Sequence, residues 1–294
     1  MPASTSLDMT LLPGARALLA AHARELPQRD DLCGAFCAAL ALRAAGVERS
    51  PGGGEPLDQD AVALAAGSVV SRLADTGLLP FGERGRRDYR LTVPFVEDMA
   101  TSGTTAAGLV AAVAELSGGR LAAIPYARPW TARTLGGLFD LVAALERPVA
   151  LVANLATRHL WGTHPRADQL LDYLCDGEQA GPPSDWDVGH FVCVVGRIQG
   201  PRGSLYAIAD TYPSLGAGGV YLQPQERLAA ALERRDMPAG GMIVIASAED
   251  APAVRAGAGA LGLVEDIWDN GTVTLETQRQ EASQRQEASQ REEA

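Results

Sequence analysis

The chain of 294 residues carries a formal net charge of −11 at neutral pH, which argues against a general nucleic-acid binder, because that class needs surplus basic side chains. All 25 basic residues are arginine, and the absence of lysine excludes Schiff-base lysine chemistry and a phosphate-loop lysine. Apolar residues make up 47% of the sequence and aromatic residues only 5%, which is typical of a packed globular protein with small side chains.

Apolar side chains recur at helical spacing through the N-terminal part of the chain. The helices that this pattern predicts cover residues 8–25, 33–45, 61–77 and 106–119. Pro13 interrupts the first helix, and Thr104 or Thr105 caps the last. We expect loops over the glycine- and proline-rich segment 50–60 and the arginine-rich segment 81–91.

From residue 120 onward, short apolar runs alternate with helical patterns. The predicted strands cover residues 120–127, 148–155, 190–198, 204–210 and 242–247, and the predicted helices cover 131–147 and 249–262. A long polar insertion, 156–187, precedes the third strand. The turn sequence Gly-Pro-Arg-Gly at 200–203 predicts that the third and fourth strands form an antiparallel hairpin.

These elements predict one α+β domain over residues 1–276, with a helical part over about 1–115 and a sheet part over about 116–276. The segment 277–294 repeats the polar sequence QRQEAS and has no apolar stripe that could pack on a core. We expect it to be a solvated or disordered appendage.

The sequence also indicates a compartment. No run of about 18 apolar residues is present, so we expect no membrane span. Residues 1–28 lack a charged leader followed by an apolar core, and we expect no signal peptide. Four cysteines without an export signal indicate reduced thiols. We therefore predict a cytoplasmic protein that binds neither membranes nor nucleic acid; the oligomeric state is not predicted.

Cys33 lies where the second predicted helix begins, directly after Asp31 and Leu32. A helix N-terminus offers a positive dipole end and free backbone N–H groups, which favour a thiolate over a thiol. Gly34 lets a substrate backbone approach closely. Gln28, in the preceding loop, is placed to form an oxyanion hole together with the Cys33 N–H group.

A reactive thiol needs a base, and the chain has four histidines. We expect His22 on the surface of the first helix, and His159 and His164 lie in the polar insertion. His190 opens a strand, where a rigid backbone holds a ring that is still reachable. Asp210 ends the strand predicted to pair with it, and its carboxylate can orient the imidazole.

The segments DLCGAFCAAL, RPVALVANL, GHFVCVVG and YAIADTYP resemble papain-like cysteine peptidases of the bacteriocin-processing, double-glycine leader peptidase type. The resemblance spans roughly residues 26–215. It implies a papain-like fold, in which a helical subdomain carrying the cysteine packs on an antiparallel sheet carrying His and Asp. It also implies that Cys33 is the nucleophile, His190 the base, Asp210 the orienting acid and Gln28 the oxyanion glutamine.

We therefore expect a cysteine peptidase that acts on a peptide or protein through an acyl-enzyme. The expected substrate-binding residues are Gly34, Trp161, Trp186 and Gly189. Two alternatives stay open: an acyltransferase or transglutaminase-like enzyme, and a catalytically inactive peptide-binding module. We expect no cofactor and no metal, because His190 and Cys193 point to opposite faces of their strand.

Overall fold

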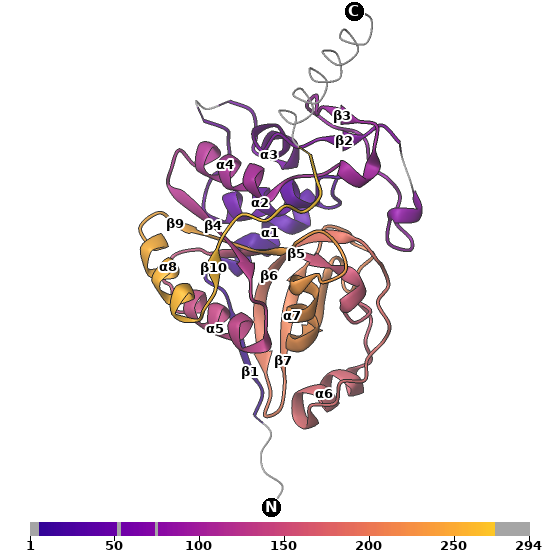
Figure 1. The fold of residues 1–294 in the computed structure, drawn as a ribbon, viewed down its shortest axis with the longest axis vertical. Coiled ribbons are helices and arrows are strands. Elements are labelled where there is room, and N and C mark those ends of the chain that lie inside the picture. The colour runs from indigo at the N-terminus through magenta and orange to yellow at the C-terminus, as the bar shows by residue number, and fades with distance from the viewer. Residues whose placement is uncertain (1–5, 52–53, 74–75, 274–294) are drawn as a thin grey trace, which may run out of the picture.

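The computed structural model describes residues 6–51, 54–73 and 76–273 (Figure 1). Over these ranges the chain is a mixed α+β fold built around one large antiparallel sheet. The α+β class and the antiparallel sheet predicted from the sequence are confirmed. The predicted appendage 277–294 lies outside the described residues.

The α-helices of the described ranges are α1 (Ala15–Glu25), α2 (Cys33–Ala44), α3 (Gln59–Ala65), α4 (Ala106–Leu116), α5 (Ala132–Ala143), α6 (Ala167–Asp176), α7 (Gln225–Glu233) and α8 (Ala251–Ala260). Short 3₁₀ helices are η1 (Thr76–Leu78), η2 (Met99–Thr101) and η3 (Thr157–His159). The Thr105 hydroxyl accepts the Gly108 N–H and caps α4, as the sequence predicts. None of the helices in these ranges combines the length and the apolar character needed to cross a bilayer.

The strands of the large sheet are β1 (Asp8–Leu11), β4 (Leu121–Arg128), β5 (Ala150–Ala156), β6 (Gly189–Gln199), β7 (Ser204–Ala209), β8 (Val220–Pro224), β9 (Gly241–Ser247) and β10 (Val264–Glu265). Their order is β10-β4-β9-β5-β6-β7-β8, and β1 pairs with the far end of β6. The short strands β2 (Val70–Ser71) and β3 (Phe95–Val96) form a separate parallel pair.

Helices cover both faces of this sheet. Figure 1 shows α1–α4 on one side and α5, α7 and α8 on the other. For that reason β5, an uninterrupted apolar run apart from Asn154, is buried at every position. Helix α2 is likewise buried from Gly34 to Leu42, which suits an apolar helix packed against β5 and β6. Cys33, its first residue, is thereby fixed beside the sheet.

Three sequence predictions are wrong in detail. The helix predicted over 8–25 begins only at Ala15, because the residues before Pro13 form β1 and pair with β6. The helix predicted over 61–77 ends at Ala65, since Gly67 adopts a positive φ and the chain then turns into β2. The polar insertion 156–187 contains helix α6.

Candidate active site

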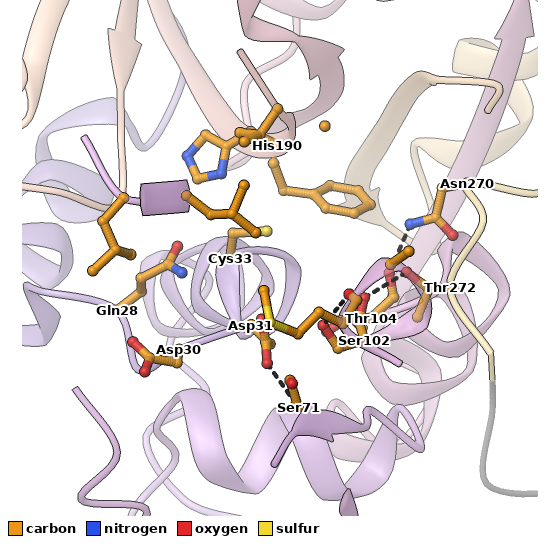
Figure 2. A pocket seen from close by; sticks show the side chains of 18 of the residues that line it. Gln28, Asp30, Asp31, Cys33, Ser71, Ser102, Thr104, His190, Asn270 and Thr272 are labelled. Atoms are coloured by element: carbon orange, nitrogen blue, oxygen red, sulfur yellow. Dashed lines mark hydrogen bonds between the residues drawn. The ribbon is translucent and has the colours of Figure 1, made fainter. Parts of the chain in front are cut away.

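A cavity of about 350 Å³ lies at the N-terminal end of α2 (Figure 2). Cys33 is half-buried in its wall. No side chain caps α2, so the backbone N–H groups of its first turn remain available as donors. The N-terminal end of α2 therefore places the Cys33 sulfur in the cavity wall, at a helix terminus that no side chain caps.

His190 and Asp210 form a buried pair next to this sulfur. His190 lies near the start of β6, Asp210 directly follows β7, and His190 Nε2 is 2.9 Å from Asp210 Oδ1. The antiparallel hairpin of β6 and β7 brings the two residues together. Cys33 and His190 both line the cavity, and Cys33 is among the groups that raise the pKa of His190. The structure thus joins the three residues that the sequence singled out.

The environment of the pair favours an imidazolium. Burial tends to lower the pKa of His190, but the charge of Asp210 and its hydrogen bond raise that pKa to about 10. Burial tends to raise the pKa of Asp210, but His190 and a hydrogen bond from the Tyr221 hydroxyl, 2.7 Å from Oδ2, hold it below its usual value. With Nε2 occupied by Asp210, Nδ1 is the ring nitrogen left for Cys33.

His22 is a buried support of this arrangement and not the surface residue that the sequence predicts. It is 2% exposed, and its Nε2 donates to the backbone carbonyl of Asp210 at 2.5 Å. Burial lowers the pKa of His22, which keeps the ring neutral. His159 and His164 do not line the cavity.

Aromatic rings shield the imidazole of His190. The Trp186 ring lies 4.7 Å from it, centroid to centroid, and the Tyr212 ring is stacked at 6.2 Å. Trp186 is held by a hydrogen bond from Nε1 to the Leu78 carbonyl. Because water is excluded on this side, the His190–Asp210 interaction is stronger than in solvent.

Gln28 is fixed in the loop between α1 and α2. Its backbone N–H donates to the Thr211 carbonyl at 3.0 Å, and its Oε1 accepts the Thr211 hydroxyl at 2.5 Å. The amide oxygen is thus occupied, and among the described residues Nε2 has no partner. Figure 2 shows this amide on the side that faces Cys33. The geometry is that of a free donor beside a candidate nucleophile.

The four predicted substrate-binding residues divide into two groups. Trp186 and Gly189 line the cavity. Gly34 does not: it is buried, and a Cβ there would meet Phe191 and Thr104, so the glycine serves close packing. Trp161 is 2% exposed in a separate apolar cluster with Tyr173, Leu174 and Leu205, away from the cavity lining.

Arg234, which the sequence did not single out, also lines the cavity. It directly follows α7 and is 4% exposed. In the sequence it lies in the charged run Glu-Arg-Arg-Asp, which resembles an exposed surface segment, so no local signal distinguishes it. Among the described residues, no group of three or more His, Cys, Asp or Glu side chains could hold a metal ion.

The sequence model of one protein family matches residues 12–269, which is most of the chain. That family is described as "Family of unknown function (DUF6885)". The matched range contains Gln28, Cys33, His190, Asp210 and Arg234. No curated protein matches the chain.

Proposed function

The chain belongs to the DUF6885 family, and we propose that it is a papain-like cysteine peptidase that hydrolyses a peptide bond through an acyl-enzyme. The observation that carries the proposal is the meeting of Cys33, at the mouth of a buried helix, with a His190–Asp210 pair in an open cavity. A helical layer supplies the sulfur and an antiparallel sheet supplies the pair, which supports the papain-like comparison.

Acylation uses the groups already described. The Cys33 thiol gives its proton to His190, Sγ forms a bond to the substrate carbonyl carbon, and the carbonyl π electrons move onto oxygen. The Gln28 amide and the Cys33 N–H group stabilise that oxyanion, because preformed donors in a partly dry site need no reorganisation. When the carbonyl re-forms, the C–N bond breaks. The proton of His190 passes to the leaving amine nitrogen, and a thioester remains.

Deacylation reverses the role of the imidazole. A water molecule attacks the thioester carbon and gives a proton to His190. The C–S bond breaks, and the acid product leaves with Cys33 restored. Asp210 holds the ring in one orientation through both steps, and the His22 and Tyr221 hydrogen bonds hold Asp210.

We further propose that the enzyme acts in the cytoplasm on peptides or proteins. All four cysteines are free thiols, the state that a reducing compartment maintains. The cavity is open and large enough to accept a short stretch of extended chain, with Trp186 and Gly189 in its wall.

The Gln28 amide gives a testable contribution. Gln28→Ala is expected to lower kcat for peptide hydrolysis by about 10²-fold with a smaller change in KM, because the lost donor contacts only the transition-state oxyanion. Steady-state kinetics measure the change. Gln223→Ala provides a control for loss of a buried amide, since the Gln223 side chain bonds to the Trp161 backbone and lies outside the cavity lining. Unchanged kcat in Gln28→Ala would remove Gln28 from the mechanism.

Alkylation of the native protein tests the proposal without a known substrate. At neutral pH, iodoacetamide is expected to label Cys33 at least about tenfold faster than Cys175, because only Cys33 has a paired imidazole and a helix N-terminus. Cys175 is a suitable internal control, since it is also half-buried but lies near the end of α6, outside the cavity lining. Peptide mass spectrometry over time gives both rates. Equal rates would contradict the enzyme and favour a binding module.

A further inference from the structure

Arg234 is a buried cation without a carboxylate partner among the described residues. Its Nη1 donates to Asn154 Oδ1 at 2.5 Å, and its Nε is buried with no hydrogen-bond acceptor. Burial lowers its pKa to about 10, and Cys33 is the group whose charge opposes that shift. Burial of an arginine that loses its hydration without gaining an anion lowers the stability of the folded protein. Such a loss indicates that the position serves a function.

Nearby carboxylates could have neutralised Arg234 and do not. Glu233 accepts the Trp130 N–H at 3.0 Å. Asp236 accepts from Arg158 at 3.0 Å and lies 3.2 Å from His159 Nε2. The chain thus directs both flanking acids away from the guanidinium and leaves it facing the cavity.

The backbone around Arg234 is shaped to admit its side chain. A Cβ on Gly189 would lie 2.7 Å from Arg234 Nη2, and a Cβ on Gly240 would lie 2.2 Å from its Cδ. Arg234 itself has φ of 44°, in the left-handed region that favours glycine. Asn154 Oδ1 also accepts the Trp268 Nε1–H at 3.1 Å, which fixes the acceptor that orients the guanidinium.

The cavity is therefore polarised. Gly189, against which Arg234 packs, immediately precedes His190. Asp30 and Asp31 lie on the other side of Cys33 from His190, as Figure 2 shows. A negative group entering the cavity is attracted to the Arg234 side and repelled from the Asp30 and Asp31 side.

We propose that Arg234 is a specificity residue that binds a carboxylate of the substrate next to the bond that Cys33 attacks. The inference rests on the proposed peptidase function and names its substrate class: peptides with an acidic side chain or a free C-terminal carboxylate beside the scissile bond. A planar guanidinium with a free edge matches a carboxylate through charge-assisted hydrogen bonds.

Two alkylating reagents that differ in one group test the subsite. Iodoacetate carries a carboxylate where iodoacetamide carries a neutral amide, so the ratio of their rates at Cys33 reports attraction of a carboxylate. We expect this ratio to exceed the ratio at Cys175 and to fall about tenfold or more in Arg234→Gln, the loss typical of a charge-assisted hydrogen bond. Arg235→Gln, an exposed neighbour outside the cavity lining, is expected to keep the wild-type ratio.

The result also separates Arg234 from a general role in activating the thiol. In Arg234→Gln the iodoacetamide rate at Cys33 measures any loss of thiol activation, and the iodoacetate rate should fall about tenfold further than that; an equal loss with both reagents would overturn the subsite. If Arg234→Gln does not fold, the wild-type protein still decides, because a ratio at Cys33 no larger than that at Cys175 contradicts the proposal.

Protection of Cys33 distinguishes the two sources of the carboxylate. The probes are acetyl-Ala-Ala-Ala with a free or an amidated C-terminus, and acetyl-Ala-Glu-Ala-amide with its Gln analogue. Stronger protection by the free acid, or by the Glu peptide, than by its neutral partner identifies the source; equal protection within both pairs overturns the inference.

Binding of the same peptides to Cys33→Ala, measured by calorimetry, separates this inference from the proposed function. Carboxylate-selective binding without turnover by wild type would contradict the peptidase function and support the Arg234 subsite. Turnover with no carboxylate preference would support the peptidase function and contradict the Arg234 subsite.

Discussion

Under the proposed function, Cys33→Ala is expected to lower kcat/KM for peptide hydrolysis by at least about 10⁴-fold, because the variant lacks the sulfur that the proposed acyl-enzyme requires and the remaining groups cannot replace it. Folding should be retained. Cys33 is half-buried at the first position of α2, and alanine suits a helix there, so the melting temperature should change by only a few degrees. Kinetics with a cleavable peptide and a thermal melt measure the two effects.

Cys175→Ala is the matched control for this substitution, because it removes a half-buried thiol outside the cavity lining. Its activity should equal that of wild type. Substantial turnover by Cys33→Ala, at a rate independent of trace wild-type enzyme, would show that another group performs the chemistry.

Asp210→Asn is expected to lower kcat by about 10³-fold at neutral pH while the fold persists. The amide keeps the shape of the side chain but removes the charge that opposes the effect of burial on His190. The imidazole then loses both its orientation and its preference for the protonated form. Full activity of this variant would mean that Asp210 does not orient the base.

The pH profile of kcat/KM should show in which direction Asp210→Asn shifts the titration of His190. In wild type, His190 stays protonated until its pKa of about 10, so the basic limb of kcat/KM should fall near that pH. In Asp210→Asn burial remains and the carboxylate is absent, so the limb should move toward or below pH 6.5, the ordinary value for histidine. A profile unchanged by the substitution would contradict the assignment.

The same pair should affect stability at both ends of the pH range. The raised pKa of His190 adds stability that is complete below pH 6.5 and lost as the pH rises through about 10. The lowered pKa of Asp210 adds stability present above its ordinary value of 3.8 and lost as the pH falls through the lower folded value. The free energy of unfolding of wild type, measured with denaturant, should fall at both ends of the pH range. In Asp210→Asn the contribution of the His190–Asp210 pair to both losses should be absent.

The parts of the site that could be predicted from the sequence are those that depend on local patterns. Cys33 begins a helix whose apolar run is long and ends at Gly46, and the turn at 200–203 sets a hairpin that brings His190 to Asp210. The long-range meeting of Cys33 with that hairpin was predicted from the base that a thiol nucleophile requires and from a resemblance between short motifs. No periodicity within either segment indicates that contact.

What the sequence missed depends on segments that are far apart. His22 looks like a surface residue on an amphipathic helix, yet the Asp210 carbonyl and the Phe36 ring cover it. Arg234 is buried because Gly189, Gly240 and Asn154 surround it; Gly189 and Asn154 are distant from it in the sequence, and no local pattern indicates their contact with Arg234. Strand β1 is exposed along most of its length and has only four residues, Asp-Met-Thr-Leu, whose polar–apolar alternation is too short to distinguish a strand from the start of a helix.

The position of β9 has a consequence for biosynthesis. This strand pairs with both β4 and β5, so the sheet stays open between them until the ribosome has made residues 241–247. Arg234 and the Trp268 contact to Asn154 are added at the same late stage. A nascent chain therefore exposes Cys33 long before a finished cleft exists around it, and the cleft is complete only after residues 241–247 and Trp268 have been made.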